Sequence, residues 1–254
     1  MNAGAARVTF AGHATVRIDL AGRSVLTDPV LKRRVAHLRR RSQPVAAAIS
    51  LGLDAVLISH LHFDHLDIAS LKIIPGHFEV IVPRGAGKLL ASAGFGHVTE
   101  MSEGESVELG DLTIRAVKAD HDGRRRPGGA SAETLGYVLE GAGENIYFAG
   151  DTDVYPEMSG LVEDLDLALL PVWGWGHTLG TGHMDPAAAA RAAALLKPKL
   201  TIPIHWGTLF PMGMRRWQER FLVRPPLHFK DCAAVEAPDT EVRILQPGES
   251  LEIS

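Results

Sequence analysis

Short apolar runs separated by turns rich in glycine recur along most of the chain. Alternating apolar and polar residues predict two strands over 7–20 and 22–28, with a break at Ala21 and Gly22. Compact apolar runs predict further strands at 55–58, 80–82, 107–109, 112–117, 135–139, 145–149, 167–172 and 200–204. Residues 242–245 and 250–253 are expected to pair as a closing hairpin.

Helices are expected between several of these strands. The pattern predicts helices over 68–74, 85–93 and 217–223, and an alanine-rich helix that ends near Leu196. Asp185 is a suitable N-cap for that last helix, because Pro186 follows it at the first helical position. The alternation of strands and helices indicates an α/β protein.

Length and composition set outer limits on the kind of protein. The 254 residues are expected to form one domain, 1–254. Cys232 is the single cysteine and excludes an intrachain disulfide framework. The amino terminus lacks the apolar core of a signal peptide, and Arg191 interrupts the longest helical apolar run, so no membrane span is expected. These features predict a cytoplasmic protein.

Four predicted strands, which end near residues 58, 117, 149 and 204, are followed by a turn that carries histidine or aspartate. The first of these turns is the richest, because it places three histidines and two aspartates between His60 and Asp67. If the four strand ends meet at one rim, they bring together seven side chains: His60, His62, Asp64, His65, His121, Asp151 and His205.

Imidazole and carboxylate groups in such numbers indicate a metal site. They suit zinc best, and manganese or iron less selectively. His60 and His62 are two residues apart, so on extended backbone they point the same way and can chelate one ion. Asp64 and His65 lie beyond, where the chain turns, and can face a second ion. Seven ligands therefore fit two divalent ions that share a bridging group.

Two basic segments are candidates for contact with an anionic substrate. Six of the ten residues from Lys32 to Arg41 are basic, which is typical of a solvated surface and also of a loop that attracts an anion. Arg124, Arg125 and Arg126 follow His121 closely and are the better candidates. The net charge of -4 and the lack of aromatic residues among the basic ones disfavour nucleic acid as a partner.

The motif His60-Leu61-His62-Phe63-Asp64-His65 resembles the HxHxDH motif of the metallo-β-lactamase fold, and the later ligands follow in that fold's order. The resemblance implies a four-layer αββα sandwich with a dinuclear site at one edge of the two sheets. It also implies a division of the ligands. His60, His62 and His121 would hold the first ion, Asp64, His65 and His205 the second, and Asp151 would bridge them.

Three further motifs resemble one particular branch of this fold family. Thr27-Asp28-Pro29, Tyr147–Thr152 and Ile204–Thr208 are similar to the branch that holds ascorbate-6-phosphate lactonase and N-acyl-phosphatidylethanolamine phospholipase D. His183 matches a histidine that lies by the site in that phospholipase. Asp151 stands where several true β-lactamases use cysteine, which argues against antibiotic hydrolysis.

These features predict a dinuclear hydrolase that uses a metal-bridging hydroxide on a small, anionic ester, phosphodiester or lactone. Asp64 would orient the hydroxide or accept its proton, and His183 would act as the second catalytic residue. Trp175 and His177 are further candidates for substrate contact, and His13 for support of a ligand. Two alternatives stay open, a metal-dependent nuclease and a non-catalytic metal-binding or sensing protein.

Overall fold

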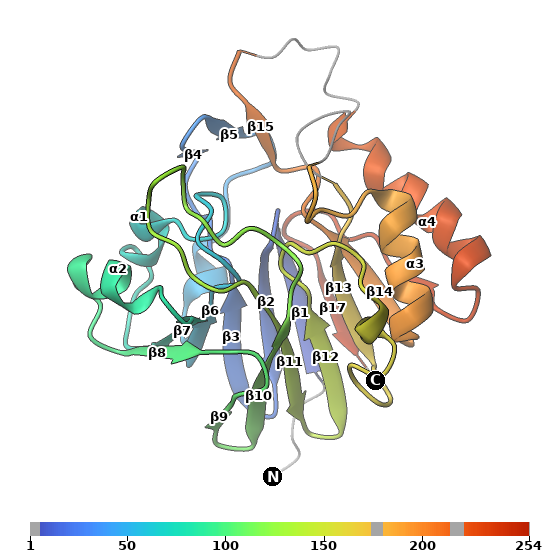
Figure 1. Cartoon of the computed structure of the whole chain (residues 1–254), viewed down its shortest axis with the longest axis horizontal. Coiled ribbons are helices and arrows are strands. Elements are labelled where there is room, and N and C mark those ends of the chain that lie inside the picture. The colour runs from blue at the N-terminus through green and yellow to red at the C-terminus, as the bar shows by residue number, and fades with distance from the viewer. Residues whose placement is uncertain (1–5, 174–179, 214–220, 254) are drawn as a thin grey trace.

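The computed structural model describes residues 6–173, 180–213 and 221–253. Two seven-stranded sheets lie against each other and helices flank them on both outer sides (Figure 1). The first sheet has the order β17-β1-β2-β3-β6-β7-β8. Its strands are β1 Ala6–Gly12, β2 Thr15–Leu20, β3 Arg23–Thr27, β6 Ala55–Leu57, β7 Glu79–Pro83, β8 Val98–Met101 and β17 Ser250–Ile253.

The second sheet has the order β16-β14-β13-β12-β11-β10-β9. Its strands are β9 Ser106–Leu109, β10 Leu112–Lys118, β11 Leu135–Gly141, β12 Glu144–Phe148, β13 Leu167–Pro171, β14 Leu200–Ile204 and β16 Glu241–Val242. A small third sheet joins β15 Leu209–Pro211 to the hairpin of β4 Arg34–Val35 and β5 Leu38–Arg40.

Helices α1 Ile68–Leu71 and α2 Gly87–Ser92 cover the first sheet, and α3 Pro186–Leu196 and α4 Arg224–Glu236 cover the second (Figure 1). Two 3-10 helices, Ala47–Ser50 and Pro156–Met158, lie in the connections. One apolar cluster fills the space between the sheets and continues under α3, while a second lies beneath α1 and α2. The αββα prediction is therefore confirmed.

Local signals in the sequence explain several of these elements. The carboxylate of Asp185 accepts a hydrogen bond from the backbone N–H of Ala188 at 2.7 Å and caps α3, as expected. Asp67 caps α1 in the same way. The hairpin of β9 and β10 is confirmed by its antiparallel register. Helices α1 and α2 are shorter than the predicted 68–74 and 85–93.

The predicted closing hairpin is wrong. β16 pairs in parallel with β14 in the second sheet, whereas β17 pairs with β1 in the first, so the chain crosses between the sheets at its end. Most of the predicted helix 217–223 lies outside the described residues. The predicted strand 7–20 is two strands, because the chain reverses at Gly12 and His13, which have φ angles of 109° and 59°.

Candidate metal centre

The carboxyl ends of several strands meet at one edge of the two sheets. β3 and β6 run parallel in the first sheet, and β12, β13 and β14 run parallel in the second. The loops that follow these strands therefore leave at the same edge, where polar residues on connections can converge. All seven predicted ligands lie in loops that follow β6, β10, β12 and β14.

The first cluster consists of His60, His62 and His121. Nε2 of His60 lies 3.0 Å from Nδ1 of His62, and Nε2 of His121 lies 3.1 Å from the same atom. The three residues form one of the groups whose ligand atoms are close enough to bind a common ion. His60 is fully buried, whereas His62 and His121 are partly exposed.

Hydrogen bonds to the other ring nitrogens fix which atoms of this cluster carry protons. The Ser59 hydroxyl donates to Asp28, so its oxygen accepts from Nδ1–H of His60 at 2.9 Å. Nδ1–H of His121 donates to the carbonyl of Gly182 at 2.8 Å. In a neutral imidazole the second nitrogen is then a lone pair. Two lone pairs therefore face Nδ1 of His62, an arrangement that a cation satisfies.

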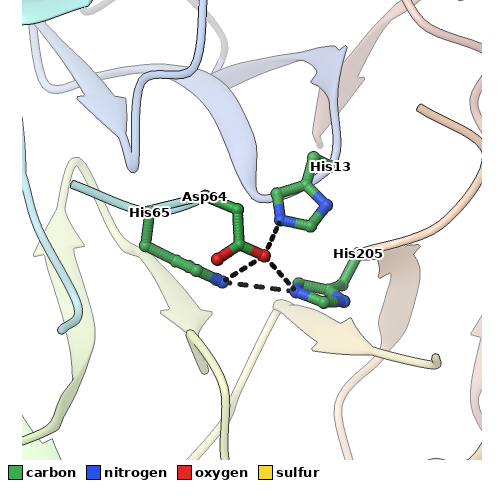
Figure 2. A group of neighbouring side chains, drawn as sticks. All are labelled: His13, Asp64, His65 and His205. Carbon is green, nitrogen blue, oxygen red and sulfur yellow. Dashed lines mark hydrogen bonds and ion pairs between the residues drawn. The ribbon is translucent and has the colours of Figure 1, made fainter. Parts of the chain in front are cut away.

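The second cluster lies deeper and contains carboxylate as well as imidazole (Figure 2). Nε2 atoms of His65 and His205 are 3.2 Å apart. Oδ2 of Asp64 lies 3.9 Å from the first of these nitrogens and 3.8 Å from the second. His13 completes the group, with its Nε2 3.1 Å from the same Asp64 oxygen.

The Nδ1 atoms of His65 and His205 also have hydrogen-bond partners. Nδ1–H of His65 donates to Asp28 at 2.7 Å, and Nδ1–H of His205 donates to the carbonyl of Trp173. The two Nε2 atoms are left to point at each other and at the carboxylates. Hydrogen bonding of the far nitrogen to a carboxylate or carbonyl is the usual way in which proteins orient a metal-binding histidine.

Asp151 lies between the two clusters. One of its oxygens is 3.3 Å from Nε2 of His65 and the other is 3.3 Å from Nε2 of His205. It also forms a close group with His121 and His183. Its buried Oδ1 receives no hydrogen bond from any described residue. Because an unsatisfied buried carboxylate oxygen is costly, this atom is suited to a metal ligand shared by both clusters.

The spacing of the donor atoms fits bound ions. Tetrahedral zinc with bonds of about 2.0–2.1 Å holds its nitrogen ligands about 3.3 Å apart. The neighbouring nitrogen pairs of the two clusters are 3.0, 3.1 and 3.2 Å apart. The geometry and chemistry of the donor set therefore fit two adjacent divalent ions.

Burial keeps the first cluster neutral. It lowers the pKa of His60 well below its usual value, lowers that of His62, and lowers that of His121 to about 4. Neighbouring histidines add to this, since the positive form of each imidazole repels the others, while the carboxylate of Asp151 acts in the opposite direction. Neutral rings keep the lone pairs that a metal ion requires.

In the second cluster, opposite charges outweigh burial at Asp64, His65 and Asp151, whereas burial still lowers the pKa of His205. Burial alone would raise the pKa of Asp64 and Asp151, but neighbouring histidines, His65 and His205 among them, lower both well below their usual value. Burial alone would lower the pKa of His65, but Asp151, Asp28 and Asp64 raise it. The carboxylates therefore favour positive charge at Nε2 of His65, where an ion would replace the proton.

Asp28 is a supporting residue to which sequence reasoning gave no role. Its carboxylate accepts hydrogen bonds from Ser59 N–H, the Ser59 hydroxyl and His65 at 2.6–2.7 Å. Its φ of 34° is strained for a residue other than glycine, and such strain persists where the surroundings hold the backbone firmly. The Thr27-Asp28-Pro29 motif, placed at the end of a buried strand, was the signal that could have found it.

The predicted substrate residues are placed differently from one another. The His183 side chain is 27% exposed and its Nε2 lies 3.7 Å from Asp151, so it faces the site and can be reached from solvent. Arg124 pairs with Asp122, and Arg126 is exposed. Arg125 donates to the carbonyls of Leu61 and Leu66 and lies over the Phe63 ring.

Arg125 therefore supports the loop that carries His62 and Asp64, and contact of the three arginines with substrate stays a prediction. Trp175 and His177 lie outside the described residues. Among the residues that are described, none of the helices combines the length and apolar character needed to span a bilayer.

Known proteins share this sequence pattern. A model of the beta-lactamase superfamily domain matches residues 23–206. A UPF0173 metal-dependent hydrolase from Methanopyrus kandleri is 32% identical over 259 residues, which cover 97% of this chain and 99% of that protein. An N-acyl-phosphatidylethanolamine-hydrolyzing phospholipase D from Caenorhabditis elegans is 32% identical over 233 residues, which cover 81% of this chain and 64% of that enzyme.

A solved structure agrees with the fold. Igni18, a metallo hydrolase from the archaeon Ignicoccus hospitalis, superposes with a TM-score of 0.75 over 98% of both chains, at 22% sequence identity. At that identity the likeness concerns the architecture alone. Together with the matched family model and the full-length relative, the paired clusters of histidine and aspartate show that this chain belongs to the metal-dependent hydrolases of the metallo-β-lactamase superfamily.

Proposed function

We propose that this protein is a dinuclear hydrolase that acts on a small anionic phosphodiester, with a lactone or another ester as the related alternative. The observation that carries the proposal is the convergence of ligand atoms in two clusters, with the buried Oδ1 of Asp151, which receives no hydrogen bond from a described residue, between them. His60, His62 and His121 would hold one ion, and Asp64, His65 and His205 the other. Zinc is the metal that this donor set suits best, with manganese or iron as substitutes.

Two bound ions would make a water molecule acidic enough to attack near neutral pH and would stabilise negative charge that develops on the substrate. The chain's own residues supply the remaining functions. Asp64 is ionised and only 14% exposed, so its carboxylate can orient the attacking water and accept its proton. Its position beside both His65 and His205 supports a place next to the second ion.

His183 is suited to the leaving-group side of the reaction. It lies on the loop before α3, its side chain is part exposed, and its ring is 4.6 Å from that of His121. A histidine in this position can donate a proton to the leaving oxygen, which is a contribution of about 10²- to 10⁴-fold in typical enzymes. It can also bind a substrate oxygen by hydrogen bonding.

Two observations support an anionic substrate. The phospholipase relative is named for the hydrolysis of a phosphodiester lipid. In addition, the hairpin of β4 and β5 carries the exposed residues Arg34 and Arg39 directly opposite each other, which is an unfavourable pairing unless an anion lies between them. No carboxylate among the described residues forms an ion pair with either one.

Hydrogen bonds link this basic hairpin to the turns that carry His13 and His205. The backbone N–H of Arg41 donates to the carbonyl of Thr208, close to His205, and the buried guanidinium of Arg40 donates to the carbonyl of Ala11, close to His13. Figure 1 shows β4, β5 and β15 beyond the edge of the two sheets at which the strands β1 and β14 end. An anionic group of a bound substrate would meet these arginines near the reacting centre.

A hydrolysis screen with defined metals tests the proposal. Metal-stripped protein would be reconstituted with zinc, manganese or iron and assayed on bis(p-nitrophenyl) phosphate, p-nitrophenyl phosphate and a γ-lactone. The expected result is turnover of the diester that needs added metal and is lost in Asp64→Asn, while that variant retains the ion held by His60, His62 and His121. Metal binding with no turnover of any substrate would favour the non-catalytic alternative.

The nuclease alternative has its own test. If nucleic acid is the substrate, a gel shift with an oligonucleotide should show binding that weakens steeply with salt and depends on Arg34 and Arg39. We expect no such binding, and hydrolysis of small diesters without it would exclude a nuclease.

A further inference from the structure

One histidine of the second cluster has no part in the ligand division. His13 comes from the turn between β1 and β2, is 1% exposed, and lies with Asp64, His65 and His205 (Figure 2). We propose that His13 is a positioning residue: it donates a hydrogen bond from Nε2 to Oδ2 of Asp64 and so fixes the Asp64 carboxylate toward the second ion. This inference rests on the proposed dinuclear site and adds a residue to it.

The backbone of His13 is held in place by the other half of the site. Its N–H donates to Oγ1 of Thr208 at 2.8 Å, and its carbonyl accepts from N–H of His205 at 2.8 Å. The turn that carries His13 is thereby bound to the turn that carries His205, although the two belong to different sheets. Both residues have positive φ angles, 59° and 63°, which such contacts must stabilise.

The residue before His13 must be glycine for this contact to form. Gly12 has a φ of 109°, and a Cβ atom at this position would lie 2.5 Å from Oγ1 of Thr208. The close approach of the two turns therefore depends on the absence of a side chain at position 12. It places the His13 ring 4.0 Å from the His205 ring and within reach of Asp64.

The partner of Nε2 of His13 indicates whether this residue is a metal ligand or a hydrogen-bond donor. Nε2 of His13 lies 3.1 Å from Oδ2 of Asp64, which is hydrogen-bonding distance. An ionised carboxylate can only accept, so Nε2 must carry the hydrogen in this contact. His65 and His205 donate from Nδ1 to Asp28 and to the carbonyl of Trp173, which keeps their Nε2 atoms for a metal ion, whereas His13 donates from Nε2. His13 is therefore the donor of the group, and Asp64, His65 and His205 are left as ligands.

This hydrogen bond has a consequence for Asp64. It occupies one lone pair of Oδ2 and leaves another lone pair of the same oxygen on the side of His65 and His205, where the second ion would lie. It also favours the ionised carboxylate that both metal binding and water orientation need. Contacts of this kind, one step removed from the metal, typically change affinity or activity about 10- to 100-fold.

Two substitutions separate this role from a structural one. Asparagine tolerates a positive φ but is too short to reach Asp64, so His13→Asn keeps the turn and removes the donor. Glutamine is longer and carries an amide N–H at about the reach of Nε2, so His13→Gln restores a donor. Metal-stripped proteins would be titrated with zinc by calorimetry, which measures the affinity of each ion without an activity assay.

We expect His13→Asn to lower the affinity for the second zinc ion about 10- to 100-fold and the affinity for the first by less than about threefold. His13→Gln should recover most of the loss. In an Asp64→Ala background, His13→Asn should cause no further loss, because the acceptor of the hydrogen bond is already absent. With a substrate found in the screen, kcat should fall in His13→Asn while KM changes little.

Other outcomes would overturn the proposal. Equal weakening of both ions, or equal loss in His13→Gln and His13→Asn with a lowered melting temperature, would indicate a purely structural role. Complete loss of the second ion in both variants, without a change in melting temperature, would make His13 a ligand. Failure of the proposed hydrolase function would appear separately, as intact binding of both ions without turnover.

Discussion

The two clusters of the candidate metal centre differ in how they are held. In the first, His62 and His121 are partly exposed and the three ligands are all neutral imidazoles. In the second, His65 and His205 are buried and lie beside the carboxylates of Asp64 and Asp151. The second cluster is therefore buried and carries carboxylates that favour a cation, whereas the first opens toward solvent.

Asp28 connects the two. Its carboxylate accepts directly from His65 and also from Ser59, whose oxygen in turn accepts from His60. One buried carboxylate thus orients a ligand in each cluster. The difference between the clusters lies in charge and exposure, while their support is shared.

The largest effect is expected at the group that both clusters share. Asp151→Ala removes the carboxylate that we propose bridges the two ions. It should lower kcat/KM about 10³-fold or more, since charge stabilisation by a metal is worth several kcal/mol and each 1.36 kcal/mol is tenfold. Zinc content should fall below two per chain. A variant that keeps two ions and normal activity would show that Asp151 is no bridge.

A smaller effect is expected on the open side. His183→Gln should lower kcat about 10²-fold by removing a proton donor, and should leave the content of both ions unchanged. Stopped-time assays together with metal analysis would check it. Loss of an ion in this variant would instead show that His183 is a metal ligand.

The shared support can be tested at Asp28. Asp28→Asn keeps the shape but replaces an acceptor with a donor that faces His65, so the second ion should bind about 10- to 100-fold more weakly. Asp54→Asn is the matched control, because Asp54 also accepts hydrogen bonds from Arg23 and Ser24, outside the site. Equal zinc affinity in the two variants would contradict the role of Asp28.

Arg125 should affect the stability of the fold through the loop that carries His62 and Asp64. Arg125→Met removes the donors to the Leu61 and Leu66 carbonyls and should lower the free energy of unfolding by about 1 kcal/mol, since the side chain is only half buried. The exposed pair of Arg124 with Asp122 provides the control, and Arg124→Gln should change stability by less than about 0.5 kcal/mol. Denaturant titration measures both.

The pH dependence of the metal-free protein should report the buried histidines. The pKa of His121 is lowered to about 4 and that of His13 to about 3, chiefly by burial. A lowered histidine pKa stabilises the fold above the usual value near 6.5, and this contribution is lost as pH falls toward the lowered value. His65 has a raised pKa, so its contribution is fully present below pH 6.5 and is lost only as pH rises.

Between pH 6.5 and 4.5 the melting temperature of the metal-free protein should therefore fall, by about 5 °C or more. His13→Asn should reduce the change of melting temperature with pH. Replacement of the exposed His77 by glutamine should not, which makes it the control. A flat melting profile in this range would show that burial does not keep His13 and the first cluster neutral.

Much of the fold and most of the candidate site could be predicted from local sequence patterns. Compact apolar runs with turn residues marked most strands, and the residue types directly after four of them marked the ligands. The pairing of β17 with β1 could not be predicted, because nothing near residues 250–253 indicates a partner almost the whole chain away. Long-range pairing is chosen by packing and leaves little trace in local periodicity.

The supporting residues were harder to predict for a related reason. His13 and Asp28 act through hydrogen bonds to residues far away in sequence, Asp64 and His65. Their positive φ angles have no signal beyond a neighbouring glycine or proline. The basic hairpin shows the converse, since one run of basic residues contains both the buried Arg40, which binds backbone carbonyls, and the exposed Arg34 and Arg39.

The most direct test of the account is a zinc titration of the metal-stripped protein and of two single-ligand variants. We predict two ions per chain in the unaltered protein, and one ion each in His62→Ala and His205→Ala, from different clusters. The one remaining ion should bind in the buried, carboxylate-rich cluster of His62→Ala and in the open, all-imidazole cluster of His205→Ala. Binding of only one ion by the unaltered protein would contradict the two-cluster centre. Loss of both ions in either variant would contradict it as well.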